Sequence, residues 1–164
     1  MKILIFLHGT IIMHKNAASK TREDRVRQSS EREKSVLDYE SYIPIGNAVE
    51  KLRGWNQQGA EIIYLSSHRL ESDVVKDKLV LKKFNFPEGL VLFRKNGEKY
   101  NDLVETNAPD VLVEDDCESI GGEKEMTITF VRPEIRQKIK LIVVREFQGV
   151  DGLSDNINFL LISK

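Results

Sequence analysis

The stretch MKILIFLHGT, residues 1–10, decides the fold, because its five consecutive apolar residues, Ile3 to Leu7, stop abruptly at a polar turn. An unbroken apolar run of this length, closed by glycine, is typical of a central parallel strand that is covered on both faces. Residues at the carboxyl end of such a strand face the crevice in which open α/β sheets bind ligands. His8, directly after the run, is therefore the first candidate functional residue.

Length and composition place the chain among soluble proteins of one domain. Its 164 residues predict a single domain, 1–164, which buries about 70% of the surface of the unfolded chain. With 25 basic and 26 acidic residues the net charge is -1, which gives no footprint for general nucleic-acid binding. The single cysteine excludes an internal disulfide framework. Because the first apolar run is too short to span a bilayer and precedes no signal-peptide cleavage pattern, we expect a cytoplasmic protein without a membrane anchor.

Residues 14–42 form a charged insertion after the first predicted strand. The segment is crowded with both charge signs and with good helix formers, which indicates an exposed position. Two interpretations stay open for it. It is either a solvated helix with no role in binding or a lid over the ligand crevice.

Predicted strands and helices alternate along the rest of the chain. Apolar residues spaced three and four apart predict an amphipathic helix with Pro44 as an early residue and Gly59 at its end. Short apolar runs predict strands at 61–66, 90–93, 110–113, 126–131 and 140–144, with helices at 72–84 and from Lys99 towards Asn107. This alternation favours a three-layer α/β/α fold with a mainly parallel, Rossmann-like sheet.

The second predicted strand ends in hydroxyl and basic side chains. Ser66, Ser67 and Arg69 follow it, and all three donate hydrogen bonds to phosphate oxygens. The alternative is that one of the serines only caps the following helix. Ser66 and Ser67 are therefore candidates for an anion site at the edge of the sheet where His8 is expected.

The strand at 110–113 ends in three adjacent carboxylates, Glu114, Asp115 and Asp116. Such a group repels itself unless solvent or a cation relieves it, and Mg²⁺ prefers oxygen ligands of this kind. The plain alternative is a solvated acidic turn. Asp115 and Asp116 are the candidate metal ligands.

Together these strand ends resemble the haloacid dehalogenase-like hydrolase superfamily, and the likeness runs from Lys2 to about Gly122. In that family a first strand ends in Asp-x-Asp-Gly-Thr, the next in Ser or Thr, a lysine steadies the charge, and a pair of acids holds Mg²⁺. The resemblance implies an HAD-like fold with little or no cap beyond the insertion, and Mg²⁺ as the cofactor. It also implies a small phosphorylated ligand bound by Gly9, Thr10, Ser66, Ser67 and Lys99, with Lys95 in reserve, and metal ligands Asp115 and Asp116.

The first motif departs from the family pattern. Alignment on Gly9-Thr10 places Phe6 at the position of the nucleophilic aspartate and His8 at that of the acid/base aspartate. Phenylalanine can neither attack phosphorus nor bind Mg²⁺, so the family's covalent chemistry does not carry over.

Three functional hypotheses follow. The first is a protein that has lost hydrolysis and retains a phosphate- or nucleotide-binding pocket. The second is an active Mg²⁺-dependent phosphohydrolase that uses His8 as nucleophile or base. The third is an esterase, because Leu7-His8-Gly9 also resembles the oxyanion turn of α/β-hydrolases, although the chain has no Gly-x-Ser-x-Gly motif.

Other cofactor sites find no support in the sequence. His14 and His68 have no metal-ligand spacing to another histidine or to cysteine, which predicts no zinc site. P-loop and dinucleotide-binding glycine patterns are absent from the sequence too.

Overall fold

A five-stranded parallel sheet forms the centre of the computed structural model, which describes residues 1–162. Its strands follow the order β5-β4-β1-β6-β7, so the first strand of the chain lies in the middle. The strands are β1 (Lys2–Phe6), β4 (Glu61–Leu65), β5 (Leu90–Leu92), β6 (Val111–Asp115) and β7 (Lys140–Val144). The predicted buried first strand is confirmed, because Ile3, Leu4 and Ile5 are inaccessible to solvent.

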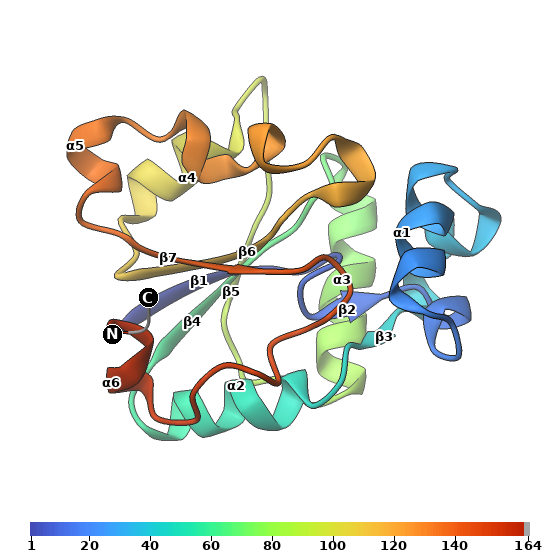
Figure 1. Cartoon of the computed structure of the whole chain (residues 1–164), viewed down its shortest axis with the longest axis horizontal. Helices are drawn as coiled ribbons and strands as arrows, with labels where there is room; N and C mark the ends of the chain where they lie inside the picture. The colour runs from blue at the N-terminus through green and yellow to red at the C-terminus, as the bar shows by residue number, and fades with distance from the viewer. Residues whose placement is uncertain (163–164) are drawn as a thin grey trace.

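Helices cover both faces of the sheet, which makes three layers (Figure 1). Ile3 and Ile5 of β1 pack towards α2 (Ala48–Gln57) and α3 (Glu71–Lys83), while Leu4 packs on the other face with α4 (Tyr100–Asn107). Successive side chains of a strand point to opposite faces, so one apolar run serves both layers. The predicted α/β fold is thereby confirmed.

The predicted start of the first amphipathic helix was wrong. Pro44 lies in β3 (Ile43–Pro44), which pairs antiparallel with β2 (Ile12–Met13), and α2 begins only at Ala48. The amide of Ile45 donates to the carbonyl of Ile11, which keeps the chain extended beyond the proline. Proline fits such a position because it needs no ladder hydrogen bond from its own nitrogen.

The strand predicted at 126–131 is a 3₁₀ helix, Thr127–Phe130. The amides of Thr127 and Ile128 donate to the carboxylate of Glu114, 2.8 and 3.1 Å away, instead of to a neighbouring strand. Met126, Ile128 and Val131 are buried against the α4 face of the sheet. The predicted strand is therefore wrong, because the buried Glu114 carboxylate accepts the backbone hydrogen bonds that a neighbouring strand would otherwise accept.

The charged insertion, 14–42, folds into short helices beside α3, at the carboxyl end of the sheet (Figure 1). They are η1 (Lys15–Ala17), α1 (Arg22–Ser30), η2 (Lys34–Leu37) and η3 (Tyr39–Ser41). The Thr21 hydroxyl accepts a hydrogen bond from the Asp24 amide, which caps the first turn of α1. The Tyr42 hydroxyl donates to the Val36 carbonyl and ties the last turns together.

The remaining elements are short: η4 (Glu118–Ile120), η5 (Glu123–Glu125), η6 (Thr127–Phe130), α5 (Pro133–Arg136) and α6 (Ile157–Leu160). Among residues 1–162, none of the helices has the length and apolar character needed to cross a bilayer.

Candidate functional site

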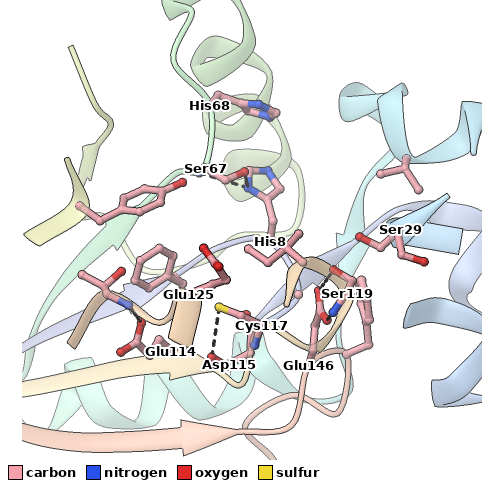
Figure 2. Close-up of a pocket in the computed structure, with 18 of the residues that line it drawn as sticks. His8, Ser29, Ser67, His68, Glu114, Asp115, Cys117, Ser119, Glu125 and Glu146 are labelled. Atoms are coloured by element: carbon pink, nitrogen blue, oxygen red, sulfur yellow. Dashed lines mark hydrogen bonds between the residues drawn. The ribbon is translucent and has the colours of Figure 1, made fainter. Parts of the chain in front are cut away.

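A cavity of about 1020 Å³ opens at the carboxyl end of the sheet. The turn after β1 contributes His8 and Gly9, and the loop between β4 and α3 contributes Ser67, His68 and Arg69. The ends of β6 and β7 contribute Asp115 and Glu146, and the insertion contributes Tyr39 and Tyr42. Parallel strands deliver their carboxyl ends to one edge, so residues far apart in sequence meet there (Figure 2).

His8 is held between a buried carboxylate and a serine. Its Nε2 lies 2.9 Å from Asp77 Oδ1, and its Nδ1 lies 2.7 Å from Ser67 Oγ. Asp77 is 1% exposed and also accepts a hydrogen bond of 2.5 Å from Ser66 Oγ. Burial opposes the ionisation of Asp77, but His8, Ser66 and His68 outweigh it and hold the pKa of Asp77 below its usual value. Because the Asp77 carboxylate can only accept, His8 Nε2 carries the proton of that hydrogen bond.

The His68 ring lies edge-on to the His8 ring and tilted against the Tyr39 ring. Its ring centre lies 4.6 Å from that of His8 and 4.1 Å from that of Tyr39. Burial, followed by the nearby His8, lowers the pKa of His68, so the ring is neutral at pH 7. The Nε2 atom of His68 lies 3.6 Å from Asp77 Oδ1.

An acidic group of three carboxylates, Asp115, Asp116 and Glu146, lies at the carboxyl ends of β6 and β7, and Asp115 and Glu146 line the cavity. Asp115 accepts hydrogen bonds from the Thr10 hydroxyl at 2.7 Å and the Cys117 amide at 3.0 Å. Glu146 accepts from both the amide and the hydroxyl of Ser119, each at 2.6 Å. These donors fix the carboxylates in place, and the group could hold a metal ion.

The pKa of Glu146 is raised to about 7, chiefly by burial; the charges of Asp115 and Asp116 add to this rise, and the hydrogen bonds from Ser119 oppose it. Burial likewise raises the pKa of Asp115. The folded protein therefore binds a proton at Glu146 in a pH range where the unfolded chain has released it.

We expect Glu146→Gln to reduce the pH dependence of stability. Between pH 4.5 and about 7 the folded state binds more protons at Glu146 than the unfolded state, so raising the pH lowers the free energy of unfolding. The two pH units from 5 to about 7 correspond to about 3 kcal/mol, at about 1.4 kcal/mol for each pH unit. Urea denaturation at pH 5 and pH 8 should show a smaller loss in the variant by about this amount. Glu50→Gln, the same change at an exposed position of α2, should lose as much stability between pH 5 and pH 8 as wild type does. If Glu146→Gln also lost as much as wild type, the expectation would be contradicted.

Phe6 ends β1 and lines the cavity. Its ring meets that of Tyr100 edge-on, with centres 5.1 Å apart, and the Arg94 guanidinium lies 3.9 Å from the Tyr100 ring centre. Arg69, Arg94 and Lys99 bring three cationic side chains to this wall. This wall is thus aromatic and basic.

Comparison with solved structures finds phosphatases and RNA-repair proteins. A class C acid phosphatase from Bacillus anthracis, solved with tungstate, has a TM-score of 0.57 at 11% identity, over 90% of this chain and 68% of that chain. Two structures of the Pnkp1/Rnl/Hen1 RNA-repair complex have TM-scores of 0.54 and 0.50 at 15% and 14% identity, each over 88% of this chain. The chain has a phosphatase-like fold.

These likenesses concern the fold alone, because the identities are low. The chain spans 46% and 43% of the length of the two Pnkp1/Rnl/Hen1 chains that it matches. No family profile and no curated protein matches the sequence. By the chemistry of their side chains, the acidic group and the group of His8, His68 and Asp77 could each hold a metal ion.

The structure brings most of the sequence-predicted residues to one cavity, in different roles. His8, Gly9, Ser67, Lys99 and Asp115 line it. Thr10 is fully buried and its hydroxyl donates to Asp115, so it supports a cavity residue instead of facing a ligand. Asp116 accepts from the Glu146 amide at 3.0 Å, and the Arg22 guanidinium lies 3.7 Å from its other oxygen.

The two predicted serines lie differently. Ser66 is fully buried, and its hydroxyl donates to Asp77 and accepts from the His68 amide at 3.1 Å. Ser67 is exposed at the cavity wall. Of the two hydroxyls, that of Ser67 is accessible to a ligand.

Two of the other predicted side chains stand apart from the acidic group. Both oxygens of Glu114 accept backbone amides, and burial raises the pKa of Glu114 to about 7. Lys95 lies with its ammonium 4.8 Å from the centre of the Phe93 ring, while Lys99 precedes α4 and lines the cavity.

Sequence reasoning missed Asp77 and Glu146. Asp77 interrupts the buried face of α3, formed with Val74, Val80 and Leu81, and an acid on an apolar helical face is a signal that it has a buried partner. Glu146 follows β7 by two residues, so the rule that located the other strand-end residues could have located it too.

Proposed function

We propose that this protein binds a small phosphorylated molecule in the cavity and does not hydrolyse it through an aspartyl-phosphate. The observation that carries the proposal is Phe6, which ends the central strand of a phosphatase-like fold at the edge where the cavity opens. An aromatic ring at this point excludes attack by a carboxylate on phosphorus. The Phe6 ring does not prevent phosphate binding, because the side chains that would contact a phosphate lie on other elements.

Three cationic side chains on one wall support an anionic ligand. Arg69, Arg94 and Lys99 line the cavity beside the Ser67 hydroxyl. Arginine and lysine form charge-assisted hydrogen bonds with phosphate oxygens, and a serine hydroxyl adds a further donor. The cavity volume is also in the range of sites that hold a nucleotide-sized molecule.

The acidic group fits Mg²⁺ by the chemistry of its donors. Asp115, Asp116 and Glu146 each offer a carboxylate oxygen, and these oxygens lie within 4.8 Å of one another. When bound there, Mg²⁺ supplies positive charge that compensates phosphate oxygens. The raised pKa of Glu146 has the same origin, since burial and two neighbouring carboxylates favour either a proton or a cation.

A second candidate function rests on one specific observation, the hydrogen-bonded chain Ser67–His8–Asp77. Both ring nitrogens of His8 are engaged, so His8 would act through Ser67 as a general base. The Ser67 Oγ–P bond would form while the bond from phosphorus to the alcohol oxygen breaks, and the serine proton would pass through His8 to the leaving alkoxide. Water would then hydrolyse the phosphoserine.

Thermal unfolding and a phosphatase assay test the two functions together. We expect no release of p-nitrophenol from p-nitrophenyl phosphate, with or without Mg²⁺, and a rise of Tm by about 5 °C or more at saturating inorganic phosphate. Lys99→Met should abolish most of this rise, whereas Lys95→Met, the same change outside the cavity wall, should preserve it.

Two outcomes would overturn the binding proposal. One is a Tm that responds to neither phosphate nor Mg²⁺. The other is turnover that disappears in both Ser67→Ala and His8→Ala, which would establish the second function. Labelling of Ser67 by a fluorophosphonate also tests the esterase hypothesis, because that reagent reacts with activated serines irrespective of the natural substrate.

A further inference from the structure

We infer that His8, His68 and Asp77 form a binding site for one transition-metal ion of the Zn²⁺ class, separate from the acidic group. The three side chains come from the turn after β1, the loop after β4 and the middle of α3. Their ligand atoms lie within 4.8 Å of one another. This proposal departs from the sequence analysis, which expected no zinc site because the ligands show no recognisable spacing.

The distances between the ligand atoms suit a tetrahedral ion. His8 Nε2 and His68 Nε2 lie 2.9 and 3.6 Å from the same oxygen, Asp77 Oδ1. Zn²⁺ bonds of about 2.0–2.2 Å place neighbouring ligand atoms roughly 3.3 Å apart in a tetrahedral site. The two observed distances bracket this value, so small side-chain rotations suffice to admit the ion.

An orphaned nitrogen points to the same place. His68 Nε2 is buried and has no hydrogen-bond partner within residues 1–162. A buried polar atom in this state costs free energy, and a metal bond removes that cost. The His68 side chain is 11% exposed, and the Tyr39 ring packs against it, so bulk water is largely excluded from this atom.

Two serine hydroxyls form hydrogen bonds with the proposed metal ligands. Ser66 Oγ donates to Asp77 Oδ2, and Ser67 Oγ lies at hydrogen-bond distance from His8 Nδ1. Metal binding at His8 Nε2 would shift the ring proton to Nδ1, from which it donates to the Ser67 oxygen. Outer hydrogen bonds of this kind orient metal ligands and fix the histidine tautomer.

The donor set distinguishes this site from the acidic group. Two imidazoles and one carboxylate favour Zn²⁺ and its neighbours, whereas three carboxylates favour Mg²⁺. Both histidines line the cavity and lie one above the other in Figure 2. Three protein ligands leave the fourth position of a tetrahedral zinc ion for an exchangeable ligand.

Metal titration of the full chain tests the site without any phosphate. The protein is stripped with EDTA and titrated with ZnCl₂ by calorimetry and with CoCl₂ by visible absorption, which reports tetrahedral coordination. We expect one ion per chain in wild type and at least about 100-fold weaker binding in His68→Ala. Removing a residue that hydrogen-bonds to a metal ligand lowers metal affinity by about 10- to 100-fold, and removing the ligand itself should lower it more. Asp115→Asn, in the acidic group, should bind Zn²⁺ as wild type does.

Nitrogen NMR of the histidine rings gives a readout that needs no variant. The chain has three histidines, and Zn²⁺ should shift Nε2 of His8 and His68 while leaving His14, whose Nε2 lies 3.1 Å from Gln28 Oε1. Absence of Zn²⁺ binding, unchanged affinity in His68→Ala, or loss of binding in Asp115→Asn alone would each overturn the proposal. None of these outcomes bears on phosphate binding, which is measured in EDTA or with Mg²⁺.

Discussion

Asp77→Ala is expected to lower the free energy of unfolding by about 3 kcal/mol, measured by urea denaturation in EDTA. The carboxylate is fully enclosed and serves His8 and Ser66 at once, with His68 close to the same oxygen. Its removal leaves the buried Ser66 hydroxyl and the His8 imidazole without their common partner. A gain in helix propensity from alanine in α3 offsets only a small part of this loss.

Asp73→Ala provides the matched control for this prediction. Asp73 lies one turn earlier on α3 and pairs with Lys76 at 3.0 Å near the surface. An exposed pair of this kind contributes less than about 1 kcal/mol. Equal losses in the two variants would show that Asp77 does not organise the buried network.

Phe6→Asp is expected to bind Mg²⁺ at least about tenfold more tightly than wild type, which corresponds to about 1.4 kcal/mol. The substitution adds an oxygen ligand at the end of β1, beside β6 and its terminal Asp115. Without Mg²⁺ the variant should be less stable, because it loses the edge-on contact with Tyr100 and places another negative charge at an acidic edge.

The measurement is Tm as a function of Mg²⁺ concentration. Phe130→Asp makes the same change at another phenylalanine of the cavity wall, on η6, where the side chain is largely exposed. It should respond to Mg²⁺ as wild type does. An equal response in all three proteins would show that the end of β1 does not reach the cation position.

The central position of the first strand could be anticipated from a local pattern, because that strand is an unbroken apolar run with a polar end. Ile3 to Ile5 are buried on both faces, which a run without alternation predicts. The carboxyl ends of parallel strands share an edge, so the sequence predicts a crevice at the strands that carry His8, Ser66 and Asp115. His8 and Asp115 line the cavity, but Ser66 is buried and its neighbour Ser67 lines the cavity instead.

The strand predicted at 126–131 failed for a reason that no local pattern contains. The Thr127 amide donates to the side chain of Glu114, which lies thirteen positions earlier in the chain. This hydrogen bond depends on how β6 positions the Glu114 carboxylate in the folded protein. Glu146 could have been recognised as a strand-end residue, but its proximity to Asp115 arises only when β7 pairs with β6.

The sequence by itself determined the α/β fold class, the central strand and the absence of a carboxylate at Phe6, because hydrophobic period and residue chemistry are local properties. Only the tertiary structure decided which polar groups act together. His8, His68 and Asp77 are up to 69 positions apart and show no spacing, yet they meet because a parallel sheet aligns strand ends and α3 returns across them. The sequence determines which side chains are available, whereas their grouping depends on long-range pairing of strands and on the packing of α3.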